Sequence, residues 1–558
     1  MHKVSPKSRL LLFAALFLAF NAQALYLVHY NSLTNDEPFE ITGGYYYWTK
    51  GDVVTSRMQP PLAAALQTLP LLFLHLDKAH GFVNEDDRAY RFFFQANLQK
   101  LQSLTLIPRL VSLIFGWGIG FLLLARVRKE SFVLMAVVLG LWAFEPNLIA
   151  HSAIAKSDIT LAFFFFAAVL AYDRALGEEG WKTAFWTGLL TGVAITTKVT
   201  ALALGPVYLG LEALEFMAPK KKGPVFNPMK ILARWAWVFL GAFIWIGLIY
   251  LPGTLLLPDH RCPYSYFLDK VLMGWRISQK GWAYYYYLGQ TSDASHVLYL
   301  PMAFLFKSTL PFLILLASAF LLWSLGKVKL KAYEWLAPLV FFLSVLPASN
   351  MGIRLMLPAL PFLLLVAGHG AVWMWEGTGK AVQKTYQWAL AALAVCLVLS
   401  LALHFPNYLS YSNEILSDGN KSHFLADADL DWGQDQLRLC QLAKEKGWTH
   451  IKLALFAGVD PHFYGLDWSP WTVKDLQGPQ AGWVYLVDTS FFQLGPAFFP
   501  ETSSIARGWA SQREPNGKLG DTWRYFEMPG NPTKDESPLL HSAPAFRYYW
   551  KGNAQVFY

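Results

Sequence analysis

Long runs of apolar residues, separated by short loops, constrain this 558-residue chain more than any other feature. A helix that spans a bilayer needs roughly 20 mostly apolar residues. Only 15% of the residues are charged, whereas soluble domains carry roughly 25%, so a purely soluble enzyme is excluded. We therefore expect a polytopic α-helical membrane protein with about eleven transmembrane helices, within residues 10–26, 104–124, 131–149, 159–172, 184–197, 199–214, 231–251, 297–322, 335–346, 353–373 and 388–404.

The short loops between these runs indicate the orientation. Basic residues occur in alternate loops, including Arg126, Arg128, Lys129, Lys182 and Lys327. Because Lys and Arg favour cytoplasmic loops, we expect a cytoplasmic N-terminus with an uncleaved first anchor. Residues 1–405 then form a transmembrane domain whose loops 28–103 and 252–296 lie outside. Residues 406–558 form a C-terminal extracytoplasmic domain. The apolar segment 62–76 is only about 15 residues long, too short to span, and we expect it at the interface.

The tail differs in character from the rest of the chain. An amphipathic stretch at 431–446 and two strand-like runs, at 451–456 and 483–487, predict a small α/β domain. The acidic DLDWGQD stretch at 429–435 lacks the glycine and the distal glutamate of an EF-hand loop. We expect it to start a helix, where acidic residues near the N-terminus are favourable.

Composition also limits the partners and cofactors. The net charge of +8 comes from basic residues between apolar runs, which favours membrane lipids over nucleic acid. Cys262, Cys396 and Cys440 show no paired spacing, so neither a zinc site nor a disulfide framework is indicated. A single bridge between Cys262 and Cys440 remains open. No cofactor is firmly implied, and a divalent metal has no support from ligand spacing.

A carboxylate pair follows the first apolar run directly. In NDEPFEITGGYYYWTKGD, Asp36 and Glu37 fall within a few residues of the expected outer membrane surface. A carboxylate there can act as a general base, since a low dielectric raises its basicity. The alternative is that Asp36 only caps a helix that starts at Pro38, because proline is favoured at the first helical position.

Four cations fall near the expected outer ends of apolar runs. They are Arg109, Lys198, Lys307 and Arg354. A charge at that depth is costly unless it is paired or functional, and four converging cations would suit a phosphate. The alternative is snorkelling to lipid headgroups. The loop HSAIAKSD adds His151, Lys156 and Asp158 as supporting candidates, and with one histidine and one carboxylate it falls short of a metal signature.

Six motifs together carry a family resemblance. They are the first-loop NDEPFEITGGYYYWTKGD with QPPLAAALQTLPL, AKSDITLAFFFFAAVLAYDRA, GLLTGVAITTKVTAL, SNMGIRLMLPALPFLLLVAG and YLSYSNEILSDGNKSHFLADADLDWGQDQL. In this order, from Leu10 to about Lys446, they resemble bacterial members of glycosyltransferase family 39. These are phospholipid-carrier-dependent glycosyltransferases of the GT-C fold, related to protein O-mannosyltransferases and the lipid A aminoarabinose transferase.

The resemblance implies inverting transfer of a mannose-like or related hexose at the outer face of the bacterial inner membrane. The donor would be a polyprenyl-phosphate-linked sugar, and the acceptor a protein, lipid or glycan. Asp36 would be the base, Glu37 its neighbour, and the four cations would hold the carrier phosphate, with Lys198 and Arg354 the firmer matches. Relatives commonly show His-Pro-Pro-Leu where this chain has Gln59 at the first position, so a histidine contribution is absent.

Two other functions compete with this interpretation. A lipid or sugar transporter or flippase would use the membrane-embedded charges as a substrate pathway, but transporters often contain internal repeats, and none is evident here. A polymerase or ligase of surface polysaccharide would differ in its acceptor more than in its chemistry. Large outer loops and an outer tail favour an enzyme.

Overall fold

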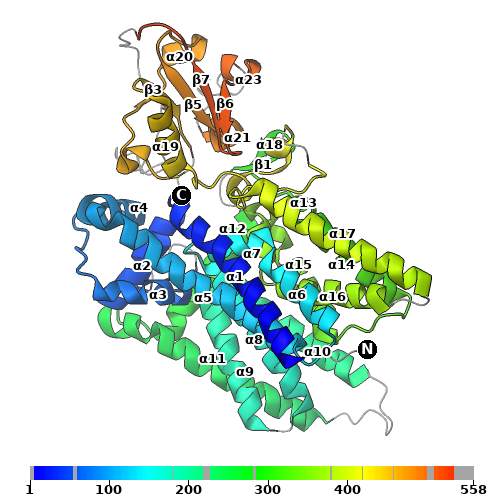
Figure 1. The fold of residues 1–558 in the computed structure, drawn as a ribbon. Coiled ribbons are helices and arrows are strands. Elements are labelled where there is room, and N and C mark those ends of the chain that lie inside the picture. The colour runs from blue at the N-terminus through cyan, green and yellow to red at the C-terminus, as the bar shows by residue number, and fades with distance from the viewer. Residues whose placement is uncertain are drawn as a thin grey trace.

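A bundle of helices carries a smaller sheet-containing domain at one end (Figure 1). The computed structural model describes residues 5–53, 59–178, 180–217, 227–280, 284–376, 380–416, 419–456, 458–498 and 508–532. The helices of the first half are α1 Pro6–Tyr30, α2 Glu37–Lys50, α3 Leu62–Thr68, α4 Glu85–Tyr90, α5 Leu101–Val127, α6 Phe132–Ala143, α7 Pro146–Ser152, α8 Ser157–Gly177, α9 Trp181–Thr197 and α10 Leu204–Met217.

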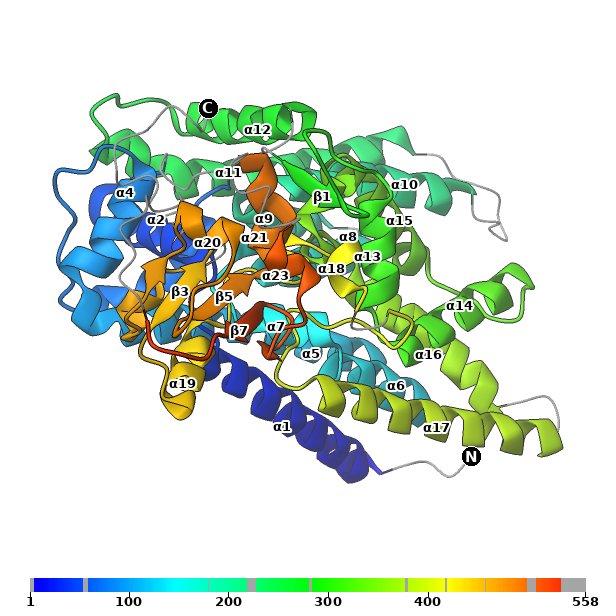
Figure 2. The same ribbon diagram turned by 90° about the horizontal axis from the view of Figure 1, so that it is seen from above.

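The second half of the bundle contains further long helices and a small hairpin. They are α11 Pro228–Leu256, α12 Pro263–Lys280, β1 Tyr285–Tyr287, β2 Gln290–Ser292, α13 Tyr299–Lys307, α14 Leu310–Ser324, α15 Ala332–Val345, α16 Leu360–Glu376 and α17 Lys380–His404. Viewed from above, α12 lies along one edge of the molecule, while α1 and α17 lie along the opposite edge (Figure 2).

The prediction of a polytopic helical membrane protein is confirmed, but its count of spans is not. Among the described residues, 6 helices are long and apolar enough to cross a membrane, or up to 8 if two bent pairs each count as one span. The predicted runs at 184–197, 335–346 and 353–373 overlap α9, α15 and α16, which have 17, 14 and 17 residues. Segment 62–76 forms only α3 and a 3₁₀ turn, too short to span.

Two runs that the sequence presents as continuous are in fact broken. The helix axis bends by 53° between α6 and α7, and by 113° between α13 and α14. Pro146 and Pro311 stand in the first turn of the second helix of each pair. Proline has no N–H to continue the preceding helix, yet its fixed φ suits a new helix start, so hydropathy hides both breaks.

The C-terminal domain is the predicted small α/β unit. Its five-stranded sheet has the order β4-β3-β5-β7-β6, with β3 parallel to β4 and β5, and β7 antiparallel to β5 and β6. The strands are β3 Ile451–Ala454, β4 Ser469–Pro470, β5 Val484–Asp488, β6 Gly517–Leu519 and β7 Trp523–Glu527. The helices are α18 Lys421–Phe424, α19 Gln436–Lys446, α20 Val473–Gln477, α21 Thr489–Phe498 and α23 Trp509–Gln512.

Two sequence-based details of this domain are corrected. The helix expected over 431–446 begins only at Gln436, and Asp435 stands at its N-cap position, where its side chain accepts from Arg438 and Thr522. A bridge between Cys262 and Cys440 is wrong, since all three cysteines are free. Cys440 packs inside the core of the domain with Leu439 and Leu453, whereas Cys262 is exposed.

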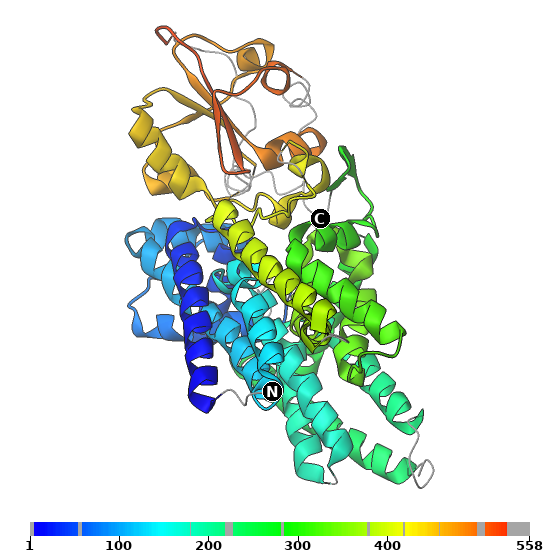
Figure 3. The ribbon, with the colours of Figure 1, turned by 45° about the vertical axis from the view of Figure 1, so that its right-hand side comes forward.

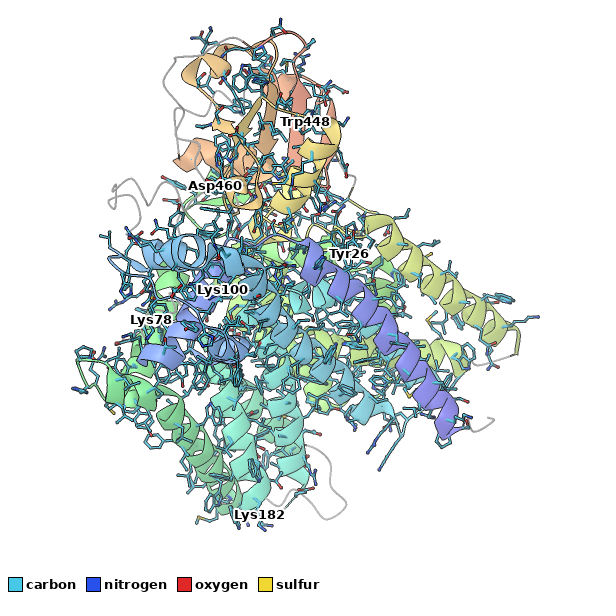
Figure 4. All side chains as sticks on the ribbon, turned by 60° about the vertical axis from the view of Figure 1, so that its left-hand side comes forward. Tyr26, Lys78, Lys100, Lys182, Trp448 and Asp460 are labelled. Carbon is cyan, nitrogen blue, oxygen red and sulfur yellow. The ribbon has the colours of Figure 1, made fainter. Side chains whose placement is uncertain are left out.

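The start of the tail is built into the bundle. Tyr408, Leu409, Ala428 and Trp432 belong to the same hydrophobic core as the bundle helices. The sheet then stacks on that end of the bundle (Figure 3). Lys182 lies at the far end of the molecule from Trp448 and Asp460 of the sheet domain (Figure 4). Lys182, which we expect on the cytoplasmic side from the sequence, and the C-terminal domain, which we expect outside, therefore lie at opposite ends of the molecule.

Candidate active site

The ends of several bundle helices meet beneath the C-terminal domain. The loop after α1 carries Asp36, α8 begins just after Lys156, and α9 ends at Thr197, directly before Lys198. A 3₁₀ turn, Ile353–Met356, brings Arg354 to the same place. We define the charge cluster as the six ionisable side chains that meet here, Asp36, Glu40, Lys156, Asp158, Lys198 and Arg354.

Asp36 is the carboxylate of the charge cluster that is most open to solvent. It stands at the N-cap position of α2, but its side chain makes no capping hydrogen bond. One carboxylate oxygen instead lies 2.9 Å from Lys156 Nζ and 3.2 Å from Arg354 Nη1. The side chain keeps 30% of its surface exposed. Capping therefore does not explain Asp36, which joins two cations from distant segments while facing solvent.

These two cations control the protonation of Asp36. Burial alone would raise the pKa of its carboxyl group, but the ammonium of Lys156 and the guanidinium of Arg354 outweigh burial and hold the pKa well below its usual range. Attraction between opposite charges favours the ionised form. Asp36 is therefore a carboxylate at neutral pH. The expectation that a low dielectric raises its basicity is wrong for the free protein, because the two cations lower its pKa instead.

Lys156 and Arg354 are each held by a second partner. Lys156 Nζ also lies 2.9 Å from Glu40, which follows Asp36 by one helical turn on α2. Arg354 Nε donates to the carbonyl of Met351 at 2.8 Å. Its guanidinium lies 4.7 Å from the ring centre of Trp432, within the range of a cation–π contact. Both cations are thus fixed beside Asp36.

A second ion pair lies deeper, between Lys198 and Asp158 at 2.5 Å. The other oxygen of Asp158 has no hydrogen-bond partner within the described part of the chain, and neither do the buried atoms His151 Nδ1, Ser157 Oγ and Thr160 Oγ1. Buried polar atoms in proteins are normally hydrogen-bonded. This concentration of unpartnered polar atoms beside the ion pair indicates a place where a polar ligand or water binds.

Glu37 does not share the surroundings of Asp36. Both Glu37 and Arg109 are 0% exposed, and they form a bidentate pair with distances of 2.7 and 2.6 Å. Arg109 also donates to three backbone carbonyls, so all five of its N–H groups are used. The expectation that Arg109 contacts a carrier phosphate is wrong for this geometry. Its sequence position near a span end gave no sign of a buried structural partner.

Lys307 is likewise engaged elsewhere. Its ammonium donates to the carbonyl oxygens of Leu409 and Asp429, both at 2.6 Å, and the residue is 1% exposed. It therefore ties α13 to the tail, and the expected phosphate contact is not supported by this position. Of the four cations expected to converge, only Lys198 and Arg354 belong to the charge cluster.

The remaining candidates lie around the site. His151 lies in the last turn of α7, with its ring 6.2 Å from that of Trp432. Gln59 is partly exposed and precedes α3, which packs against α2. Within the described ranges, no group of three or more His, Cys, Asp or Glu side chains could hold a metal ion.

Two functional neighbours were missed in the sequence. Glu40 follows Asp36 at the i,i+4 spacing that places two side chains on one helix face, so that spacing could have identified it. Trp432 lies in the DLDWGQD stretch, and only the fold brings it against Arg354. No local signal predicts that contact.

An apolar cavity of about 550 Å³ lies between α9, α10 and α11. Its wall includes three residues that lie within four positions of Lys198 in the chain, Ile195, Ala201 and Leu202. The amide of Ala201 donates to the carbonyl of Lys198 at 3.0 Å. The cavity wall therefore begins three residues along the chain from Lys198, whose own ammonium contacts Asp158 on α8.

Comparisons with known proteins give structural neighbours only. No family model and no curated protein matches the sequence. The apo structure of ArnT from Cupriavidus metallidurans is similar with a TM-score of 0.44 and 15% identity, over 88% of this chain and 95% of that chain. The same protein bound to undecaprenyl phosphate gives 0.43 and 13%, over 88% and 95%. The Archaeoglobus fulgidus oligosaccharyltransferase, tethered with an acceptor peptide, gives 0.39 and 11%, over 83% and 63%.

Proposed function

We propose that this chain is an integral membrane glycosyltransferase of the GT-C type. It moves a mannose-like or related hexose from a polyprenyl-phosphate carrier to a protein, lipid or glycan acceptor at the outer face of the bacterial cytoplasmic membrane. Residues 1–405 form the catalytic domain and 406–558 an outer domain. The observation that carries the proposal is a solvent-facing carboxylate, Asp36, paired with two fixed cations at the outer end of a membrane bundle.

The proposed reaction is a single displacement at the sugar's anomeric carbon. The acceptor oxygen or nitrogen attacks that carbon, and the bond from the carbon to the phosphate oxygen breaks with inversion. The acceptor's proton passes to Asp36, and the polyprenyl phosphate leaves with the electron pair of the broken bond. Lys198 and Arg354 stabilise the charge on that phosphate, since fixed cations lower the barrier most where charge develops.

The apolar cavity supports a lipid donor. A polyprenyl chain loses little free energy on moving from the bilayer into an apolar cavity between the helices. It can therefore remain at the depth of the membrane while its phosphate reaches the charge cluster. The cavity's position, with a wall that begins three residues along the chain from Lys198, suits a ligand with a charged head and a long apolar tail. No nucleotide-binding glycine loop is needed for such a donor.

The test uses purified protein, several polyprenyl-phosphate-linked sugars and mass spectrometry of lipids and acceptors. We expect free polyprenyl phosphate to appear together with a glycosylated acceptor, and neither to appear with the Asp36→Asn variant. A flippase would move the lipid across a vesicle membrane without changing its mass. Movement of the lipid across the vesicle membrane, with no chemical turnover of any donor, would overturn the proposal.

Removing a cation from the charge cluster should weaken donor binding. We expect Arg354→Ala to reduce the affinity for undecaprenyl phosphate by about 10- to 100-fold, because a charge-assisted hydrogen bond contributes roughly 1.5–3 kcal/mol. Arg354→Lys should recover only part, since the guanidinium fork is lost. Titration of the detergent-solubilised variants measures the effect.

Lys198 needs a balanced variant, because its loss alone leaves Asp158 buried without a partner. The double variant Lys198→Met with Asp158→Asn removes both charges of the pair and should weaken binding over a similar range. Lys182→Ala, at the opposite end of the molecule (Figure 4), should bind as wild type does. Wild-type affinity in both cluster variants would contradict the phosphate role and favour snorkelling.

The pH profile should reveal how the donor affects Asp36. Activity needs ionised Asp36 and falls as the pH drops through its pKa. In the free enzyme Lys156 and Arg354 hold that pKa low, but a bound phosphate shares Arg354 and brings its own negative charge, which raises the pKa. The pH profile of kcat reports the enzyme–donor complex, and that of kcat/KM reports the free enzyme. We therefore expect kcat to fall on the acid side at a pH about one unit or more higher than kcat/KM does. A fall of both at the same pH in steady-state assays would contradict this coupling.

A further inference from the structure

One segment of the tail touches both loops that supply the charge cluster with Asp36 and Arg354. We call residues 427–436 the tail strap. On the Asp36 side, the amide of Ser32 donates to the carbonyl of Gln434 at 2.9 Å, and the amide of Asn35 donates to that of Trp432 at 3.0 Å. The Ser32 hydroxyl donates to Gly433 at 2.9 Å. The tail strap therefore fixes the backbone immediately before Asp36.

On the other side, the tail strap holds the turn that carries Arg354. Asp429 accepts a hydrogen bond from the amide of Ile353 at 2.9 Å. The preceding Gly352 has φ +89°, and a Cβ there would come within 2.8 Å of the same carboxylate oxygen. Glycine is needed both for this backbone conformation and for the close approach. The backbone of the turn therefore packs directly against the Asp429 side chain of the tail strap.

Trp432 is the link between the two contacts. Its carbonyl accepts from Asn35, one residue before Asp36, and its indole ring lies under the guanidinium of Arg354 at 4.7 Å. The residue is 2% exposed, and cation–π attraction is strongest with tryptophan and when water is excluded. Hydrogen bonds to Met351 and Asp36 use only part of the guanidinium, so the ring's face fixes its plane.

We propose that Trp432 is a positioning residue that orients Arg354 to receive the carrier phosphate, and that the tail strap keeps Arg354 in register with Asp36. This inference rests on the proposed function. It assigns a part of the tail, outside the bundle helices, to the donor site. Trp432 itself need not touch the donor.

The test is a double-mutant cycle read by binding of undecaprenyl phosphate. Trp432→Leu should weaken binding by about 5- to 30-fold, the range expected for a desolvated cation–π contact, and Trp432→Phe should weaken it less because an aromatic face remains. In an Arg354→Ala background, Trp432→Leu should cause no further loss, since the residue acts through Arg354.

A second buried tryptophan supplies the matched control. Trp471 lies in the core of the C-terminal domain, away from the cluster. Trp471→Leu should lower the melting temperature while the folded fraction binds the lipid as wild type does. This separates a general loss of packing from a positioning effect, and Trp432→Phe covers the case in which Trp432→Leu does not fold.

The outcomes separate the two proposals. If the wild-type protein does not bind undecaprenyl phosphate, the proposed function fails. If wild type binds and Trp432→Leu and Trp432→Phe bind equally well, the positioning role is overturned and the donor site stands. Equal losses from Trp432→Leu with and without Arg354 would also overturn the role, because the tryptophan would then act independently.

Discussion

Replacing Asp36 by asparagine is expected to lower the rate of sugar transfer by about 100-fold or more, the usual scale for a lost general base. Asparagine keeps the size and one oxygen of the side chain, but it cannot take the acceptor's proton. Donor affinity should be maintained or increased, because Lys156 and Arg354 lose a competing anion. Single-turnover release of polyprenyl phosphate, with lipid binding measured in parallel, checks both expectations.

The matched control is Glu40→Gln. Glu40 shares Lys156 with Asp36 at the same distance of 2.9 Å, but only 11% of its side chain is exposed. A change there should lower turnover far less than Asp36→Asn does. Near-wild-type turnover by Asp36→Asn would contradict the assignment and move the role of base to Glu40 or Asp158.

Replacing Arg109 by leucine should destabilise the protein strongly without acting through the donor. The change leaves Glu37 buried without its cation, and breaking a buried ion pair in this way costs about 3–5 kcal/mol. Three backbone carbonyls, one in the last turn of α1 and two just after the helix, lose this donor as well. Because total stabilities are only about 5–15 kcal/mol, we expect a large fall in melting temperature and in the yield of monodisperse protein.

An exposed pair provides the contrast. Arg174 and Glu178 lie 2.7 Å apart, but their side chains are 71% and 44% exposed, so Arg174→Leu should change stability by less than about 1 kcal/mol. Thermal unfolding in detergent compares the two variants. A normally stable Arg109→Leu protein with impaired lipid binding would show that Arg109 serves the donor after all.

The fold was predictable as far as hydropathy and sequence periodicity reach. Each predicted apolar run overlaps one or more helices, and the strands at Ile451–Ala454 and Val484–Asp488 lie within the predicted ones or extend them by one residue. What hydropathy cannot show is a change of direction inside an apolar run. The turn of 113° before α14 is an example, because the residues on both sides remain apolar.

The candidate site was predictable by residue type but not by pairing. Asp36 was identified from its place after the first span, and Arg354 from its place near the end of another. Their contact joins residues 318 positions apart. Arg109 has the same sequence signature as Arg354, yet it is a buried structural partner of Glu37. Only the arrangement of the helices separates a cation that meets the partly exposed Asp36 from one that meets the fully buried Glu37.

The contact of Ser32 with Gly433 spans 401 positions of the chain, and this separation sets the order in which the protein can mature. During synthesis, the loop that holds Asp36 leaves the ribosome long before the tail strap does. Bundle helices can form one after another, but the backbone contacts that hold residues 32–35 and Ile353 are complete only when residues 427–436 have been synthesised and have docked. Under the proposed function, a chain interrupted before residue 427 would carry Asp36 and Arg354 but would lack the contacts that hold the two residues in register.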